Sequence, residues 1–388
     1  MNAKSGRLTG GEALDRTPSG PGDDLVGRAV GEGASAIHFD WNAGTARMRV
    51  DGALRQPFAI EPELAGRLAA ELGGALVRTI AIDDRRVELR LSSLPTSPGT
   101  HAVLHLRSEG RARDGLGGLG MLPRTADIYA RALEARRGLI LLAGAARSDS
   151  APMLVAGLEA LGDGRRCVLA VDAPRGRPTP GVFHFDALPG GANTQAEILR
   201  EALDQDCDVL IVGEIAGADS AALLVEAAQD RLVLAGVRAG SAVGAIEWLR
   251  RQKVSAFHFA CALKAVVAQR LVRRLCPSCR EAVQDDRALT APLGLDSRAI
   301  VYRAKGCDRC SGTGHDGSAG VYEAIDGDDG IRLLIDRGGD QALIANQAFR
   351  QAPNFASAAR VLALEGVTTP EEAVRVSRTP IDELVHRQ

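Results

Sequence analysis

The fold is decided by residues 208–214, DVLIVGE. A short uninterrupted apolar run such as 209–212 is typical of a parallel strand that is buried on both faces, and Glu214 places a carboxylate at its end. Two further apolar runs and one helical pattern accompany it in the sequence, at 139–143, 168–171 and 194–204. This alternation predicts an α/β fold, with a parallel sheet that carries helices on both faces.

The composition is that of a globular protein with balanced charges. The chain has 388 residues, of which 45% are apolar, and this is enough for two or three domains with cores of their own. Lys and Arg number 47 against 49 Asp and Glu, so the net charge of -2 gives no general attraction to nucleic acid or anionic lipid. Aromatic residues make up only 3%, which argues against base-stacking surfaces.

No apolar run is long enough to cross a membrane, and residues 1–7 lack the apolar core of a signal peptide. We therefore expect a cytoplasmic protein that reaches a membrane only through partners.

Changes in composition divide the chain into regions. Residues 45–50 and 87–91 alternate as strands do, and 61–76 carries a helical pattern. Residues 110–120 are rich in glycine and charge, as linkers are. We expect a mobile leader at 1–26, a small α+β domain at 27–109, a linker at 110–120 and the sheet domain at 121–388, with C-terminal helices at 330–388.

Four of the seven cysteines form two Cys-x-x-Cys pairs, CPSC at 276–279 and CDRC at 307–310. Two residues between thiolates let backbone amides turn toward sulfur, and two such turns supply a closed tetrahedral site. We therefore expect a structural zinc ion, in a subdomain at 276–323, on four ligands: Cys276, Cys279, Cys307 and Cys310.

Two alternatives to zinc are a redox dithiol and inert reduced thiols. A zinc-dependent nucleic-acid binder is disfavoured, because the segment between the pairs contains Asp285 and Asp286 and no dense basic face. The other three cysteines, Cys167, Cys207 and Cys261, lie in apolar stretches and are expected to be buried.

A family resemblance rests on segments spread along the chain. Residues 268–279, AQRLVRRLCPSC, together with 208–214 resemble the type II secretion and type IV pilus assembly ATPases, which are hexameric RecA-like motors. Further segments resemble the N-terminal domain and C-terminal helices of that family: 34–40, 47–52, 92–96, 354–360 and 366–372. The resemblance implies a RecA-like sheet domain, ATP with magnesium, ring assembly and inner-membrane partners, with the tetracysteine subdomain structural or used for docking.

The phosphate loop departs from the family pattern. Such a loop needs glycines whose amides curl around phosphate, a Lys for the terminal phosphates and a hydroxyl for magnesium. Matched to the family, Gly144 and Ser148 are retained, Arg147 and Asp149 replace glycines, Ser150 takes the Lys position and Ala151 the hydroxyl position. Without the Lys, the loop loses ~4 kcal/mol of attraction between an ammonium group and a phosphate about 4 Å apart, before the cost of desolvation is counted. We expect nucleotide binding through Gly144, Arg147, Ser148 and Ser150 to be weak or absent.

Other positions of the family's catalytic machinery are altered as well. Asp172 stands where the family has an acidic box, and Glu214 matches the Walker B glutamate that orients the attacking water. Without phosphate and magnesium, we expect both carboxylates to be remnants. Three more sets of residues correspond to family positions: Ala216 and Gly217 replace Arg-Asp, 237–239 replace the histidine box, and Arg47 and Arg49 resemble arginines that reach the nucleotide.

The resemblance and the altered loop together leave three hypotheses. The first is a structural or regulatory subunit that forms a homo- or hetero-oligomer with a motor ATPase paralogue and binds inner-membrane secretion or pilus proteins, but no nucleic acid. The second is an active ATPase with an unorthodox phosphate loop. The third, a zinc-dependent nucleic-acid binder, requires salt-sensitive DNA affinity.

Overall fold

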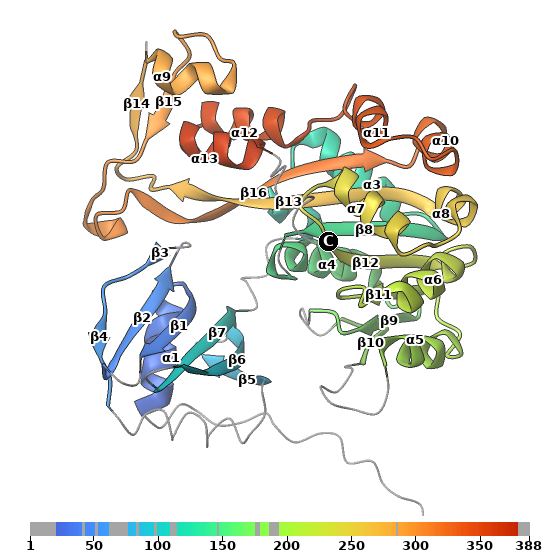
Figure 1. The fold of residues 1–388 in the computed structure, drawn as a ribbon, viewed down its shortest axis with the longest axis horizontal. Helices are drawn as coiled ribbons and strands as arrows, with labels where there is room; N and C mark the ends of the chain where they lie inside the picture. The colour runs from blue at the N-terminus through green and yellow to red at the C-terminus, as the bar shows by residue number, and fades with distance from the viewer. Residues whose placement is uncertain are drawn as a thin grey trace, which may run out of the picture. The chain divides into compact units, whose positions relative to one another are not determined.

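The computed structural model describes eleven segments of the chain: 21–40, 43–50, 53–61, 77–82, 85–96, 99–108, 115–145, 147–174, 179–185, 194–284 and 286–378. The chain divides into two compact units, Met1–Arg111 and Ala112–Gln388. We call them unit 1 and unit 2 (Figure 1) and describe each by itself.

Unit 1 is an antiparallel sheet with a helix packed on β1. Its elements are α1 (Pro21–Gly31), β1 (Ala34–Asp40), β2 (Thr45–Val50), β3 (Ala53–Leu54), β4 (Phe58–Ala59), β5 (Val77–Ile82), β6 (Arg85–Thr96) and β7 (Gly99–Ser108). The strand order is β3-β2-β1-β7-β6-β5, and β4 pairs with β2. The strands expected at 45–50 and 87–91 are confirmed, whereas the helix expected at 61–76 lies almost entirely outside the described residues.

Short helices lie at two of the expected boundaries. Helix α1 begins inside the segment expected as a leader, and Val26 is buried against the sheet of unit 1. At the other boundary, residues 115–119 form the short 3-10 helix η1 (Gly115–Leu119), and Leu119 is buried in unit 2.

Unit 2 is built on a seven-stranded sheet in the order β10-β9-β11-β12-β8-β13-β16. The strands are β8 (Gly138–Gly144), β9 (Val168–Val171), β10 (Val182–Phe185), β11 (Val209–Val212), β12 (Leu232–Arg238), β13 (Leu263–Leu275) and β16 (His315–Asp326). Strands β8 to β13 run parallel, while β16 pairs with β13 in the antiparallel sense. The sheet is therefore mostly parallel, with one antiparallel edge strand that the sequence interpretation did not include.

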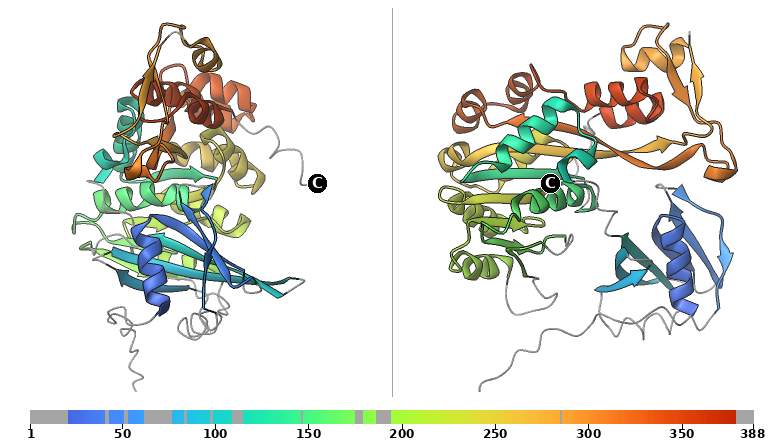
Figure 2. Two further views of the ribbon diagram at one scale, coloured as in Figure 1. Left: turned by 90° about the vertical axis from the view of Figure 1, so that its left-hand side faces the viewer. Right: turned by 180° about the vertical axis from the view of Figure 1, so that it is seen from behind.

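Helices cover both faces of this sheet, as expected. Along β8, Leu139 and Leu141 belong to one buried cluster, whereas Ile140 and Leu142 belong to the other. Helices α3 (Pro123–Leu133) and α4 (Arg147–Leu161) pack on the second face. The first face carries α5 (Gln195–Leu203), α6 (Ala218–Ala227), α7 (Ala242–Arg251) and α8 (Ala256–Ala262). The two sets are seen from opposite sides in Figure 1 and in the right panel of Figure 2.

The rest of unit 2 follows β13. A two-stranded sheet of β14 (Glu281–Val283) and β15 (Val301–Arg303) lies between the cysteine pairs, with α9 (Arg287–Thr290) and η2 (Ala291–Leu293) in its connection and η3 (Asp308–Cys310) at the second pair. Four helices follow β16: α10 (Asp329–Asp336), α11 (Gln341–Ala348), α12 (Phe355–Leu364) and α13 (Pro370–Ser377). These four helices lie in the region for which C-terminal helices were expected.

Candidate functional site

Asp172 and Glu214 lie together at the carboxyl edge of the unit 2 sheet. Strands β9 and β11 are parallel neighbours with Val171 level with Val212, so the residues that follow them emerge at one edge. Parallel α/β sheets bind ligands at this edge. Asp172 has a φ of 49°, in the left-handed region that Asp tolerates better than most residues.

Two glycines allow the backbones at the ends of β9, β11 and β12 to approach one another closely. A Cβ at Gly213 would lie 1.9 Å from the carbonyl oxygen of Asp172, and a Cβ at Gly236 would lie 2.0 Å from the carbonyl oxygen of Gly213. No side chain fits at either position, because real Cβ atoms do not approach backbone so closely. The backbone before Glu214 is therefore packed directly between β9 and β12.

Glu214 forms an ion pair with a neighbouring arginine. Arg238, the last residue of β12, places a guanidinium nitrogen 2.9 Å from Oε1 of Glu214. The Glu214 side chain is 20% exposed and that of Arg238 is 65% exposed. The guanidinium of Arg238 places a permanent positive charge against the Glu214 carboxylate.

Gln195, which the sequence interpretation missed, connects the same strand ends. Its amide nitrogen donates to the carbonyl of Glu214 at 2.9 Å, and its amide oxygen accepts from the nitrogen of Ala216 at 2.9 Å. The same amide nitrogen lies 3.5 Å from Oδ2 of Asp172. Gln195 begins α5, which is fixed by a capping box between Thr194 and Glu197. The threonine-to-glutamate spacing is the one sequence signal that marks this position.

The phosphate-loop segment connects β8 to α4. Gly144 ends β8, and α4 begins at Arg147. The side chains of Arg147, Ser148 and Asp149 lie outside the described residues. Ser150, which was expected to take the Lys position of the phosphate loop, is only 4% exposed. Its side chain is therefore short and buried.

The four paired cysteines come together beyond β13. All four Sγ atoms lie within 4.8 Å of one another, with separations of 3.9 Å for Cys276–Cys307, 3.8 Å for Cys279–Cys310 and 3.8 Å for Cys307–Cys310. A tetrahedron with zinc–sulfur bonds of about 2.3 Å has edges of about 3.8 Å, whereas disulfide sulfurs are only about 2 Å apart. The residues fit a four-coordinate zinc ion, and four sulfur ligands leave no open position for substrate.

Two backbone amides donate hydrogen bonds to the sulfur of Cys310. The amides of Cys307 and Gly314 donate to its Sγ at 3.2 Å and 3.1 Å. Burial raises the pKa of the Cys310 thiol, but these hydrogen bonds favour the thiolate more strongly, and the net pKa is lowered. Gly314 has a φ of 73°, and a Cβ there would lie 2.6 Å from that of Ala304. Only glycine fits this turn.

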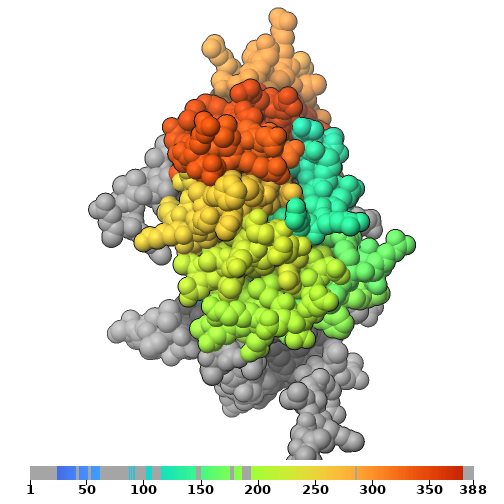
Figure 3. Space-filling view, turned by 90° about the vertical axis from the view of Figure 1, so that its right-hand side faces the viewer, coloured from blue at the N-terminus to red at the C-terminus, as the bar shows by residue number. Residues whose placement is uncertain are grey.

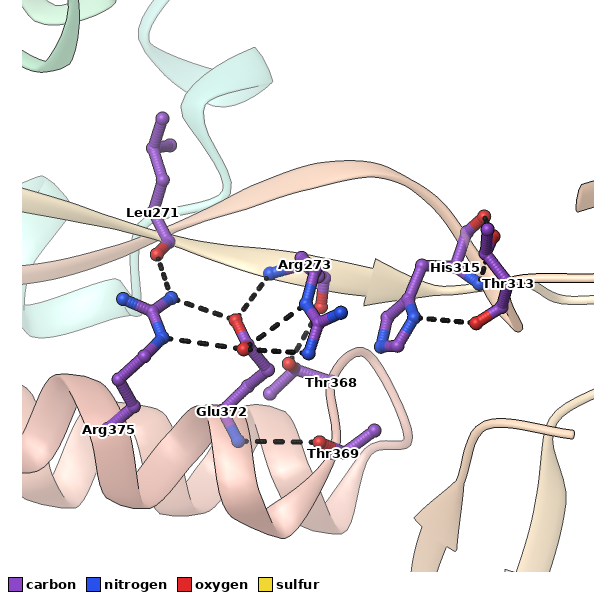
Figure 4. Close-up of polar contacts among 8 residues, drawn as sticks. All are labelled: Leu271, Arg273, Thr313, His315, Thr368, Thr369, Glu372 and Arg375. Carbon is purple, nitrogen blue, oxygen red and sulfur yellow. Dashed lines mark hydrogen bonds and ion pairs between the residues drawn. The ribbon is translucent and has the colours of Figure 1, made fainter. Parts of the chain in front are cut away.

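A buried carboxylate fixes the C-terminal helix to the strand that leads to the cysteines (Figure 4). Glu372 on α13 is 7% exposed in its side chain and accepts from the backbone nitrogen of Arg273 at 3.0 Å. It also forms ion pairs with the guanidinium groups of Arg273 and Arg375, at 3.2 Å and 2.8 Å. Thr368 donates to the carbonyl of Arg273 at 2.8 Å. The sequence Thr-x-x-Glu at 369–372 would be read as a capping box, yet this glutamate reaches β13 instead.

We expect Glu372→Gln to destabilise the attachment of α13 by roughly 1–3 kcal/mol, because the change leaves two arginines without their carboxylate. Burial alone would raise the pKa of Glu372, but the donors from Arg375 and Arg273 outweigh it and lower the pKa to about 2. The stabilisation is therefore complete above the unfolded pKa near ~4.3 and is lost as the pH falls through 2.

Hydrogen exchange of residues 370–377 at pH 7, 5 and 3 measures this effect. The gap between the wild type and Glu372→Gln should be widest at pH 7 and should shrink at pH 3. Glu371→Gln is the matched control, because Glu371 is exposed on the same helix. Equal exchange of the two variants at pH 7 would contradict the assigned role of Glu372.

The other residues singled out in the sequence lie elsewhere in unit 1 or unit 2. Arg47 and Arg49 lie on β2 of unit 1, where the Arg47 side chain donates to the carbonyl of Arg55 at 3.0 Å. Of the unpaired cysteines, Cys207 is buried as expected, Cys167 is half-buried and Cys261 is exposed. The expectation for Cys261 was wrong because Phe259, Ala260 and Ala262 already take the buried side of the short helix α8.

Sequence comparison places these features in a family context. A sequence model of the family described as "Type II/IV secretion system protein" matches residues 22–375. The chain is 33% identical over 372 residues to type II secretion system protein E of Pseudomonas aeruginosa, covering 91% of this chain and 74% of that protein. It is 30% identical to the type IV pilus assembly ATPase PilB of Thermus thermophilus, covering 90% of this chain and 42% of that protein.

Solved structures agree with the fold. The pilus retraction motor PilT with bound ADP matches with a TM-score of 0.60 at 16% identity, covering 94% of this chain and 98% of that one. The ATPase DotB of Legionella pneumophila matches with a TM-score of 0.65 at 15% identity, covering 96% and 98%. Within the described residues, no helix is both long and apolar enough to span a membrane. The matched span and the identity to the curated relatives establish that the chain belongs to the type II/IV secretion system protein family.

Proposed function

We propose that this chain is a motor-family protein of a secretion or pilus-assembly system that has lost productive ATP binding and acts as a structural or regulatory subunit. It would form homo- or hetero-oligomers with a motor ATPase paralogue and contact inner-membrane components from the cytoplasmic side. The observation that carries the proposal is the ion pair between Glu214 and Arg238.

The ion pair affects the ability of Glu214 to orient a water molecule more than it affects the stability of the fold. A pair this exposed adds only about 0–1 kcal/mol to folding. A carboxylate that orients the attacking water needs a free oxygen, and a motor site also needs a divalent cation close by. Arg238 takes one oxygen of Glu214 and adds a fixed positive charge, which repels any metal ion that approaches.

The phosphate-loop position supports the same conclusion independently. Ser150 is buried and short, and Ala151 has no hydroxyl for magnesium. Phosphoryl transfer is catalysed mainly by positioning and charge stabilisation, and both depend on the two missing ligands.

An active ATPase with an unorthodox phosphate loop is the second candidate. It is favoured by the start of α4 directly after β8, because free amides at a helix N-terminus bind anions. It is favoured also by Gln195, which holds Asp172 and Glu214 beside one another as a working site would.

Equilibrium titration with ATP and magnesium separates the two candidates. We expect no saturable binding below the millimolar range for the wild type. The double variant Ser150→Lys with Ala151→Thr should bind more tightly, since both missing ligands return, and it serves as the positive control. Micromolar binding by the wild type, weakened by removing magnesium, would support the active ATPase instead.

Zinc in the tetracysteine subdomain is proposed as a structural ion. Three of the six Lys and Arg residues at 276–323 are paired with carboxylates: Arg303 and Lys305 with Glu281, and Arg309 with Asp316. Cations that already contact a carboxylate contribute less to counterion release on meeting DNA. A docking role toward other proteins therefore fits this subdomain better than DNA binding.

A further inference from the structure

A cavity lies at the edge of the unit 2 sheet opposite Glu214, where β8, β12 and β13 begin. Its volume is about 290 Å³, and Arg137, Gly138, Gln229, Asp230, Cys261 and Lys264 contribute to its wall. Arg137 precedes β8, Gln229 and Asp230 precede β12, and Cys261 is in α8. Figure 3 shows this face of unit 2, on which the yellow segment that includes α8 adjoins the yellow-green segment of α6.

The side chain of Lys264 packs directly against the backbone of Gly138. A Cβ at Gly138 would lie 2.4 Å from Cγ and 2.5 Å from Cε of Lys264, so the lysine stem occupies the space that any other residue would fill. The φ of Gly138 is 131°, which other residues rarely adopt. This packing holds the stem of the half-buried Lys264 side chain in the wall of the cavity.

The positive charges at this cavity are not matched by carboxylates. Within the described residues, Arg137 and Lys264 make no ion pair, and Asp230 in the same wall contacts neither of them. Burial, and then the charges of Arg332 and Arg137, lower the pKa of Lys264. Such a cluster of like charges is unfavourable in the free protein, and an anion would relieve it.

Arg332 strengthens the positive field from beside the cavity. It donates to the carbonyl of Leu263, the residue before Lys264, and its Nε is buried without a hydrogen-bond partner. Its ion-pair partner Asp329 is fully exposed and 3.4 Å away, so the pair compensates this charge only weakly.

Hydrogen-bond acceptors lie elsewhere in the same wall. The amide nitrogen of Gln229 donates to the carbonyls of Val225 and His258, both at 3.0 Å, which fixes the amide and leaves its oxygen available. The Asp230 carboxylate is exposed and makes no ion pair. The wall of the cavity thus contains both cations and hydrogen-bond acceptors.

We propose that this cavity binds a small phosphate monoester, with its phosphate on Arg137 and Lys264 and a hydroxyl or amino group on Gln229 and Asp230. Arginine and lysine together suit a dianionic phosphate, because the guanidinium presents a fork of donors and the ammonium a point charge. The volume is near the lower end for small-molecule sites, which limits the ligand to a few heavy atoms beyond the phosphate. The site is separate from the nucleotide edge and does not depend on the proposed function.

Calorimetric titration of the full chain with glycerol 3-phosphate tests the proposal. Inorganic phosphate, succinate and sodium chloride at equal ionic strength are the comparison probes. We expect saturable binding of glycerol 3-phosphate, weaker binding of inorganic phosphate, and none of succinate or chloride. Lys264→Met keeps the stem over Gly138 and, like Arg137→Gln, should weaken binding by ~10-fold or more, the loss expected for a charge-assisted hydrogen bond.

The matched control is Arg136→Gln, which removes the same charge from the exposed neighbouring residue and should leave binding unchanged. A second readout is independent of calorimetry: glycerol 3-phosphate should slow alkylation of Cys261 in the wild type but not in Lys264→Met. Without ligand, Lys264→Met should melt at or above the wild-type temperature, because it removes a repelled charge. No saturable binding, tighter binding of succinate, or equal weakening by Arg136→Gln would overturn the proposal.

Discussion

Protein purified without chelator is expected to carry one zinc ion per chain, and Cys276→Ser is expected to unfold the subdomain that follows β13. Zinc ligation can contribute roughly 10–16 kcal/mol in small zinc peptides, and the two-stranded sheet β14–β15 has no large core to replace it. The Sγ separations near 3.8 Å are those of a tetrahedral thiolate site. Without the fourth sulfur, the remaining thiolates would repel one another.

The damage should stay local. The nitrogen of Cys276 donates to Gly314 and that of Leu275 to Val367, so loss of the metal should loosen residues 276–323 and the contact with the loop before α13. Hydrogen exchange should rise there in Cys276→Ser and remain slow in β8, β11 and β12. Cys261→Ser is the control, because Cys261 is exposed and outside the cluster.

Metal analysis of the wild type decides the first half of this prediction. Absence of zinc, together with alkylation of the four clustered thiols as fast as Cys261, would remove the claim.

The strands of the parallel sheet could be predicted because burial on both faces makes each of them a continuous apolar run. Residues 168–171 and 209–212 coincide with β9 and β11, and 139–143 lies within β8. The helix expected at 194–204 appears as α5, where the capping box defines its start. These elements are specified locally, so the sequence pattern is sufficient for them.

Strand β13 shows where the pattern is insufficient. Its residues 263–268 are almost wholly buried in the sheet, whereas within 270–274 only Val272 is buried and Leu271, Arg273 and Arg274 are exposed. No single period covers both halves, and 268–279 was identified by its motif without any element being assigned to it. Its antiparallel partner β16 was also missed. The pairing of these two strands spans the whole cysteine subdomain, so no local sequence pattern indicates it.

The candidate site was identified residue by residue, but its contacts were not. Glu214 and Arg238 were both singled out, yet their ion pair depends on the register of β11 against β12 and on the close backbone approach at Gly213 and Gly236. Register between parallel strands is set by the crossover helices and the packing of the sheet. A single sequence therefore indicates which residues differ from the family pattern, but the contacts between those residues depend on the tertiary structure.

The purified protein is expected to hydrolyse ATP no faster than its own Glu214→Gln variant. Removing a single preorganised charge from a transition state typically costs about 10²–10³ in rate. In the proposed match to the family, Ser150 and Ala151 take the Lys and hydroxyl positions, and Arg238 pairs with Glu214, the carboxylate proposed to orient water. The effects act on one transition state, so Glu214 should contribute nothing measurable to a rate already near background.

Variants that restore the missing Lys, hydroxyl and His side chains in steps test this prediction most directly. Ser150→Lys with Ala151→Thr should recover binding but little turnover, because Glu214 remains paired with Arg238. Adding Arg238→His to the double variant should raise turnover further, and that gain should disappear when Glu214→Gln is combined with it. An orthodox motor ATPase of the family, assayed alongside, sets the scale. Magnesium-dependent turnover in the wild type that is abolished by Glu214→Gln would contradict the loss of catalysis and establish the unorthodox ATPase in its place.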